Sequence, residues 1–274
     1  MGTNLSAGIM SAKAAPSDLA QRIMSRTSKG CANAAILMLA DGTVFYGRAC
    51  GAAGTACGEV CFNTSLEGYF EVLTDPSYAG QIVTMTYPQI GNYGIDPDDV
   101  QSAYPGSTER GAATPALRGM IVHDMCHTPS NWRSSISLPE YLKDNGIVAV
   151  EGVDTRALVR HLRDHGAQQG IISTEVFDLA ELEAKLAEAP ALVGENLVKT
   201  VSCADEYPYA AADLPAAHAF ADAAPASAKY RVVVYDCGIK RGILEGLVRV
   251  GCELTVVPWN TPASHVLEMN PDGV

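Results

Sequence analysis

From residue 34 the hydrophobic and polar positions of the chain take on patterns typical of β-strands. Residues 36–39 predict a strand, an Asp-Gly turn follows at 41–42, and residues 44–46 return as the partner of a hairpin. Residues 58–64 predict another strand. Residues 81–87 alternate in character and predict a half-buried strand, with one face against the core and one toward water.

Helical spacing begins in the middle of the chain. Residues 139–145 predict a short helix. A longer helix is expected to begin with Asp154 or Thr155 as its cap and to run to about His165. Asp178 can cap a further helix. The residues expected on the buried faces are Leu158 and Leu162 of the longer helix and Leu179, Leu182 and Leu186 of the last.

The pattern changes twice more toward the carboxyl end. Residues 203–228 are rich in Ala and contain Pro without a clear apolar period, which favours an irregular linker. Residues 231–235 predict a strand buried on both faces, and residues 253–257 predict a second strand. A helix between them should end at Gly251, and Thr261 can cap another helix. The apolar residues of the first of these helices are Ile243, Leu244, Leu247 and Val248.

This order of strand, helix, strand and helix is the opening of a doubly wound parallel sheet. Asp272-Gly273 then turns toward a third strand. Residues 229–274 hold too few elements to cover such a sheet on both faces, so the second domain is expected to be incomplete as given.

Charge and hydropathy exclude several classes of protein. The chain carries 31 acidic and 19 basic residues, a formal net charge of −12, which argues against a nucleic-acid binder. No apolar run approaches the ~18 residues that a membrane span needs. Residues 1–33 are rich in Ser and Ala and are expected to form a disordered extension. A transit peptide, or a true start at Met10 or Met24, is the alternative.

The cysteines and histidines are expected to pack rather than react. The eight cysteines include no C-x-x-C pair and most lie in apolar stretches, as in a reduced cytosolic protein. Cys237 ends a strand just before a helix, the place of a nucleophile, yet the packing interpretation is favoured there too. His123, Cys126 and His127 bring metal-ligand types together, but three residues without a fourth partner predict no metal site.

Longer runs of residues point to a known family. The most specific runs read GEVCFNTS at 58–65, EVLTDPSY at 71–78 and QIVTMTYP at 81–88. Shorter pieces follow in order: Asn131-Trp132-Arg133, Asp154-Thr155-Arg156, Asp236-Cys237-Gly238-Ile239-Lys240-Arg241 and Met269-Asn270-Pro271-Asp272-Gly273. From Ala34 to Val274 the chain resembles the small, glutamine-handling subunits of carbamoyl-phosphate synthetases.

The resemblance implies an α/β protein of two domains. A mixed β and α N-terminal domain at 34–202 would pack against a large subunit, and 203–228 would be the linker. Residues 229–274 would be the truncated beginning of a flavodoxin-like class I glutamine amidotransferase domain. The family hydrolyses L-glutamine and channels ammonia to the large subunit, which uses ATP and Mg with bicarbonate to make carbamoyl phosphate for arginine and pyrimidine biosynthesis. The implied setting is a cytoplasmic heterodimer.

The resemblance also assigns site residues. Ser77 matches a serine that reaches bound glutamine, as suits a hydroxyl that both donates and accepts. Ser65, Asp75 and Lys240 match polar positions along the ammonia route or the domain junction, with simple structural hydrogen bonding as the alternative. The cysteine nucleophile, its histidine base and the orienting carboxylate are expected beyond Val274. No catalytic residue, metal or cofactor is therefore expected in this chain.

Two other functions remain open. The intact N-terminal domain also suits a docking module that binds the large subunit without hydrolysing glutamine. A generic nucleotide or flavin binder built on 231–274 is weaker, because the Asp-Cys-Gly turn at 236–238 lacks the G-x-G-x-x-G fingerprint.

Overall fold

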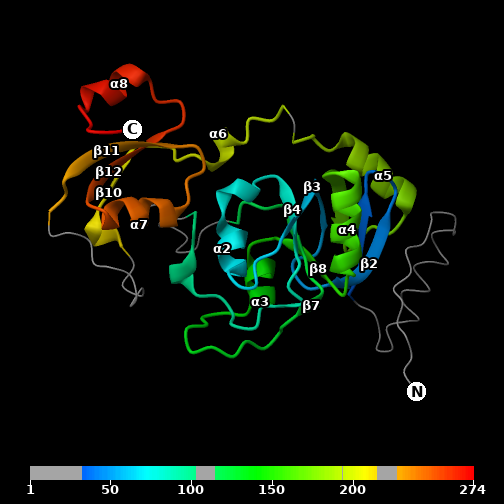
Figure 1. Cartoon of the computed structure of the whole chain (residues 1–274). Helices are drawn as coiled ribbons and strands as arrows, with labels where there is room; N and C mark the ends of the chain where they lie inside the picture. The colour runs from blue at the N-terminus through cyan, green and yellow to red at the C-terminus, as the bar shows by residue number, and fades with distance from the viewer. Residues whose placement is uncertain (1–32, 103–114, 193, 215–226) are drawn as a thin grey trace. The chain divides into compact units, whose positions relative to one another are not determined.

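A computed structural model describes residues 33–102, 115–192, 194–214 and 227–274 (Figure 1). These residues form two compact units, each described by itself below. The first unit holds the described residues up to Tyr69, those of Gly80–Ile95 and those of Leu117–Glu195. The second holds the described residues of Phe70–Ala79, Asp96–Ala116 and Asn196–Val274. The extension predicted for 1–33 falls almost wholly outside the described residues.

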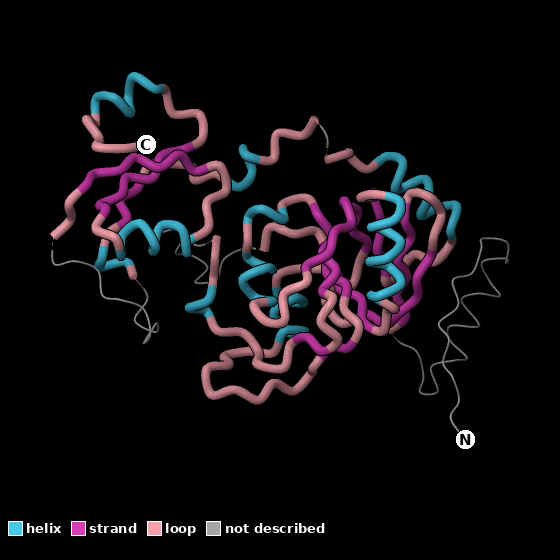
Figure 2. Tube along the Cα trace, in the orientation of Figure 1, coloured by secondary structure: helices cyan, strands magenta, loops and turns pink. Residues whose placement is uncertain are grey.

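In the described part of the first unit, seven strands close a barrel in the order β1-β2-β8-β6-β4-β3-β9. Figure 2 marks the strands along the chain in magenta and the helices in cyan. Strands β8, β6, β4 and β3 lie parallel in a row, and all pairings that involve β1, β2 or β9 are antiparallel. Closure leaves none of these seven strands with an open edge. The strands are β1 (Ala34–Leu39), β2 (Val44–Ala49), β3 (Thr55–Asn63), β4 (Gln81–Met85), β6 (Gly119–Ile121), β8 (Val148–Glu151) and β9 (Gln168–Ser173).

The predicted hairpin at the start of the barrel is confirmed. β1 and β2 pair antiparallel, with Leu37 opposite Phe45. The chain reverses through Gly42 at a φ of +83°, a conformation that glycine adopts without steric cost. Asp41 stabilises the same turn, because its Oδ1 accepts a hydrogen bond from Thr43 N at 2.9 Å.

Strand β4 differs from its prediction. The alternation in 81–87 indicated one exposed face, but Ile82, Val83, Thr84 and Met85 are all buried. β4 lies between β6 and β3 in the row of parallel strands, where both faces are covered. The alternating polar residues are threonines, which tolerate burial in a strand, and this is why the pattern looked half-exposed.

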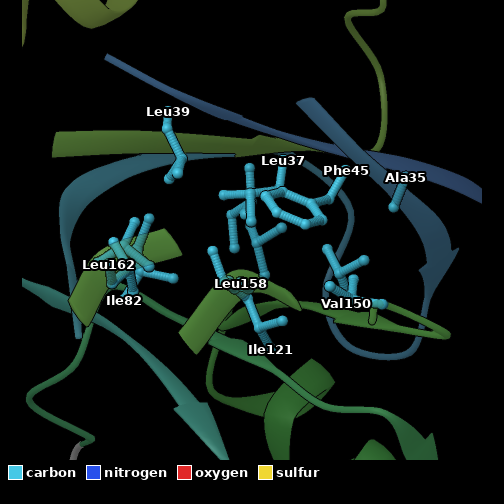
Figure 3. Packing of buried hydrophobic residues seen from close by; sticks show 13 residues of the cluster. Ala35, Leu37, Leu39, Phe45, Ile82, Ile121, Val150, Leu158 and Leu162 are labelled. Atoms are coloured by element: carbon cyan, nitrogen blue, oxygen red, sulfur yellow. The ribbon is translucent and has the colours of Figure 1, made fainter. Parts of the chain in front are cut away.

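Helix α4 (Thr155–His165) supplies part of the barrel core. Asp154 is its cap, since Asp154 Oδ1 accepts a hydrogen bond from Ala157 N at 2.9 Å. Leu158 and Leu162 are buried as predicted and point among side chains that come from the strands (Figure 3). The cluster consists of Ala35, Leu37, Leu39, Phe45, Val60, Ile82, Ile121, Val148, Val150, Val153, Leu158, Leu162 and Ile172.

Two further predicted helices form in the first unit, α3 (Leu138–Asp144) and α5 (Leu179–Glu188). Ser137 caps α3. Asp178 caps α5 and accepts a hydrogen bond from Glu181 N at 2.9 Å, as the sequence indicated. Leu182 and Leu186 of α5 pack with residues of β1 and β9 in a second cluster, outside the barrel core. The strands β5 (Gln89–Ile90) and β7 (Asp124–Met125) pair in a small parallel sheet.

The second unit contains a three-stranded sheet in the order β10-β12-β11. β11 and β12 are parallel and are joined by α7, as the predicted strand-helix-strand order requires, whereas β10 runs antiparallel to β12. The elements are β10 (Tyr207–Tyr209), β11 (Tyr230–Asp236), α7 (Arg241–Arg249), β12 (Cys252–Pro258) and α8 (Ala263–Glu268). Gly251 follows α7 at a φ of +99°, consistent with the predicted end of that helix.

Three local predictions fail in the second unit. The segment predicted to be irregular, 203–228, contains β10, whose Tyr209 is buried because β10 pairs with β12. β11 was predicted to be buried on both faces, but its valines other than Val233 are only partly buried, because β12 is the central strand of the three. Thr261 is not a cap: α8 begins after Pro262 without a side-chain cap.

The remaining elements are short. They are α2 (Tyr69–Thr74), η1 (Pro76–Tyr78), η2 (Pro97–Asp99), α6 (Val198–Val201) and η3 (Ala211–Asp213). None of the helices in the described residues has the length and apolarity that crossing a bilayer demands.

Candidate functional site

The second unit brings together three of the four polar residues that the sequence singled out. Asp75 caps the 3-10 helix η1 and is 6% exposed; its Oδ1 accepts a hydrogen bond from Ser77 N at 2.9 Å. Lys240 Nζ lies 2.7 Å from Asp75 Oδ2. Asp75, Ser77 and Lys240 are called the Asp75–Lys240 cluster below. The Lys240 side chain is 44% exposed, so the ion pair has a buried carboxylate and a partly hydrated ammonium.

Asp236 shapes the loop that carries Lys240. Its Oδ1 accepts hydrogen bonds from Gly238 N and Ile239 N, each at 2.9 Å, and its Oδ2 accepts one from Cys203 N at 2.7 Å. A buried carboxylate that binds three backbone N–H groups fixes the path of the chain out of β11. Lys240 lies at the end of this loop, directly before the first residue of α7.

Gly238 allows this loop to approach its neighbours closely. Its φ of +93° favours glycine, and a Cβ built there would lie 2.9 Å from Val201 Cγ2 and 3.4 Å from Pro76 Cβ. Pro76 directly follows Asp75, so the loop and η1 are in contact at the cluster. A larger residue at position 238 would collide with Val201, so either the loop or the Val201 side chain would have to shift.

Gln101 ties the start of α7 to the end of α2. Gln101 N donates to Thr74 Oγ1 at 3.0 Å, and its backbone oxygen accepts from Arg241 N at 2.8 Å. Gly242 N donates to Gln101 Oε1 at 3.2 Å. Thr74 and Arg241 are the chain neighbours of Asp75 and Lys240, so these bonds hold the two halves of the cluster in register.

The cluster offers a hydroxyl and an ion pair but no nucleophile with a base. Ser77 is exposed, which leaves its hydroxyl accessible to a ligand. Within the described residues of this unit the sole imidazole, His265, is hydrogen-bonded through Nε2 to Glu206 Oε2 at 2.9 Å rather than to a cysteine. The arrangement can bind and orient a polar molecule, and bond cleavage would need groups from elsewhere.

Cys237 contradicts the packing interpretation. It is exposed, because it lies on the loop after β11 and not in the strand itself. Cys203 behaves as predicted: burial, together with the nearby Asp236 carboxylate, raises the pKa of its thiol to about 11. Cys61 is similar, since burial raises its pKa to about 12. Cys31 lies outside the described residues.

Ser65 belongs to the first unit. It follows β3, is exposed, and its backbone N donates to Asn63 Oδ1 at 2.7 Å. The bond forms a local turn at the end of the strand. This is the structural role that the sequence left open beside the ammonia-route assignment.

The three residues considered as metal ligands, His123, Cys126 and His127, each have a different partner. His123 Nδ1 lies 2.9 Å from Val153 O, His127 Nε2 lies 3.5 Å from Glu151 Oε2, and Cys126 Sγ donates to Thr128 O at 3.3 Å. Across the described residues, no three His, Cys, Asp or Glu side chains gather as a metal site would require.

Sequence reasoning missed two residues that position the cluster. Asp236 could have been found from its place at a strand end two residues before a glycine, which is typical of a carboxylate that caps backbone N–H groups. Gln101 carries no such local signal, because the groups that it joins are about 27 and 140 residues away along the chain.

Comparison with known proteins identifies relatives. Residues 37–172 match the family model described as carbamoyl-phosphate synthase small chain, CPSase domain. The chain is 54% identical over 242 residues to the carbamoyl phosphate synthase small chain of Syntrophotalea carbinolica, with 88% of this chain and 61% of that protein covered. It is 48% identical over 241 residues to the protein of the same name from Thermosynechococcus vestitus, with 88% and 60% covered.

The chain spans about three fifths of the length of the curated relatives that it matches. Among solved structures, an aminopeptidase from Aneurinibacillus sp. strain AM-1 aligns over 82% of this chain and 48% of its own at 12% identity, with a TM-score of 0.31. So low a score carries no conclusion about fold or activity.

Proposed function

Because this chain belongs to the carbamoyl-phosphate synthase small chain family, we propose that it is the glutamine-handling small subunit of a glutamine-dependent carbamoyl-phosphate synthase. In this proposal the subunit hydrolyses L-glutamine and passes ammonia to a large subunit, which uses ATP and Mg to convert bicarbonate and ammonia into carbamoyl phosphate. The observation that carries the proposal is the extended similarity to small chains over 88% of the sequence.

The Asp75–Lys240 cluster supplies the proposed contact with glutamine. Ser77 presents an exposed hydroxyl on a helix that Asp75 caps, so its place is set by a buried carboxylate. We propose that the hydroxyl hydrogen-bonds a polar group of glutamine. The Asp75–Lys240 ion pair, and Ser65 in the first unit, are proposed to lie on the ammonia route or at the domain junction.

The proposal also assigns the domains. Residues 34–202 would be the N-terminal small-subunit domain, 203–228 a linker that includes the strand β10, and 229–274 the beginning of a flavodoxin-like amidotransferase domain. The parallel β11–α7–β12 unit supports the last assignment. The cysteine, histidine and carboxylate of glutamine hydrolysis would belong to the part of the family's length that this chain does not span. The described cysteines are free thiols, as suits the proposed cytoplasmic setting.

The test compares two nitrogen sources in the complex of the full-length subunit with its large subunit. We expect carbamoyl phosphate synthesis from glutamine and from free ammonia, with both dependent on ATP. Ser77→Ala should raise KM for glutamine about tenfold, the effect of one lost hydrogen bond to a polar substrate, and leave ammonia-dependent synthesis unchanged. The exposed Ser130, on a loop of the first unit, gives the matched control Ser130→Ala, which should change neither reaction.

A docking module that does not hydrolyse glutamine is the second candidate. One observation favours it. The residues that match the family model, 37–172, lie within the segment whose strands β1 to β9 form the closed barrel. This candidate predicts a stable complex with the large subunit that uses ammonia but not glutamine. Glutamine-dependent synthesis would eliminate it, and failure of the two subunits to associate would eliminate both candidates.

A further inference from the structure

A pocket lies at the carboxyl ends of parallel strands in the first unit, and the proposed function does not use it. Its volume is about 500 Å³. Thr64 follows β3 directly and Thr86 follows β4, and the two strands run parallel. α4, which begins just after the parallel strand β8, provides the other wall. The lining residues are Thr64, Thr86, Thr155, Arg156, Val159, Arg160 and Arg163.

Three guanidinium groups gather on one side of α4. At about 100° per residue, Arg156, Arg160 and Arg163 lie within about 60° of one another around the helix axis, turned away from Leu158 and Leu162. Of the three, Arg163 alone forms an ion pair with a carboxylate among the described residues, at 3.6 Å from Asp164 Oδ1. Within the described residues, the guanidinium groups of Arg156 and Arg160 therefore keep a positive charge that no carboxylate pairs with.

Hydroxyl groups line the facing wall. Thr86 N donates to Asn63 O at 3.0 Å, which continues the β3–β4 ladder one residue beyond β4. Strand alternation then places Thr84 on the same face as Thr86, next in the row. Thr84 is fully buried, and no described residue gives its Oγ1 a hydrogen-bond partner. Thr84 lies outside the pocket lining, whose hydroxyl-bearing residues are Thr64, Thr86 and Thr155.

We propose that this pocket binds the phosphoryl group of a small anionic ligand, a phosphate ester or a polyphosphate. Guanidinium groups bind phosphate oxygens through paired hydrogen bonds, and threonine hydroxyls can donate to the oxygens that remain. A volume of about 500 Å³ exceeds what one phosphate fills and falls within the usual range for small-molecule sites. A concave site of this size also fits a small ligand better than an acidic protein surface, which would lie across the mouth.

The test titrates the full-length subunit with inorganic phosphate, pyrophosphate and ATP, with sodium chloride added to hold ionic strength constant. Binding is followed by calorimetry and by the rise in thermal midpoint, since a ligand of the folded state stabilises it. Pyrophosphate is expected to bind in the millimolar range or tighter, and Arg160→Ala should weaken it about tenfold. Tighter binding of ATP than of pyrophosphate would identify a nucleotide as the source of the phosphoryl group.

Arg118 provides the matched control. It is an exposed arginine of the same unit that directly precedes β6, at the amino end of the parallel strands and thus at the opposite edge of the barrel. Arg118→Ala should bind pyrophosphate like the parent. Equal weakening by Arg118→Ala and Arg160→Ala would show attraction by net charge only and overturn the proposal. The proposal would also be overturned if pyrophosphate did not bind to a subunit whose thermal midpoint without ligand shows it to be folded. The same conclusion would follow if Arg160→Ala weakened only the association with the large subunit.

Discussion

Asp41 shows how one side chain at a turn becomes sensitive to pH. His161 Nε2 lies 2.6 Å and Gln168 Nε2 3.1 Å from its Oδ2, and Thr43 N donates to its Oδ1. Partial burial acts to raise the pKa of Asp41, but the hydrogen bonds from Thr43, Gln168 and His161 outweigh it and hold the pKa well below its usual value of 3.8. The folded carboxyl therefore resists protonation. Its contribution to stability is present above about pH 4 and is lost as the pH falls toward the folded pKa.

Asp41→Asn tests this linkage. We expect the variant to be less stable than the parent at neutral pH by about 1 kcal/mol or less, because the carboxylate is partly exposed and solvent screens it. The difference should shrink as the pH is lowered from about 5 to about 3. Urea unfolding at a series of pH values measures it. A difference that stays constant over this range would show that Asp41 is not protonated differently in the folded and unfolded chains.

At the scale of elements, short helices depend on their caps. α3 has only seven residues, of which Leu138, Tyr141 and Leu142 are buried. Ser137 and Glu140 form a capping box: Glu140 N donates to Ser137 Oγ at 3.4 Å, and Ser137 N donates to Glu140 Oε2 at 3.2 Å. Two N–H groups that the helix itself cannot satisfy are bonded in this way.

Ser137→Ala should lower the free energy of unfolding by about 1 kcal/mol, the usual cost of losing a cap. Ser137→Thr, which keeps a hydroxyl at the cap and places no second carboxylate beside Glu140, should recover part of that loss. Chemical denaturation followed by circular dichroism provides both values. If the alanine and threonine variants were equally destabilised, the cap would not be the cause.

At the scale of the whole molecule, the first unit depends on a helix that completes the core of its barrel. Leu158 of α4 is fully buried among side chains from several strands (Figure 3). Leu158→Ala would leave a cavity there, and we expect a loss of about 2–5 kcal/mol in unfolding free energy. Leu66, 74% exposed in the same unit, is the control: Leu66→Ala should change stability by less than about 0.5 kcal/mol. Similar losses for both variants would contradict a core role for α4.

The sequence by itself determined the local elements of this protein. The hairpin around Asp41, a helix start at Asp154 or Thr155, the cap at Asp178 and the parallel pair around α7 follow from turn residues, caps and apolar spacing. Such signals report hydrogen bonds between residues close in the chain, so they can be found without knowing the fold. Family membership also followed, because the matching motifs occur in order along the chain.

Only the tertiary structure decided which distant residues meet. Asp75 and Lys240 are 165 positions apart, and no local period indicates that they form an ion pair. The closure of the barrel and the strand at 207–209 have the same origin. Each depends on contacts between segments far apart in sequence, whose gain in buried surface and paired backbone groups outweighs the local preferences of the chain.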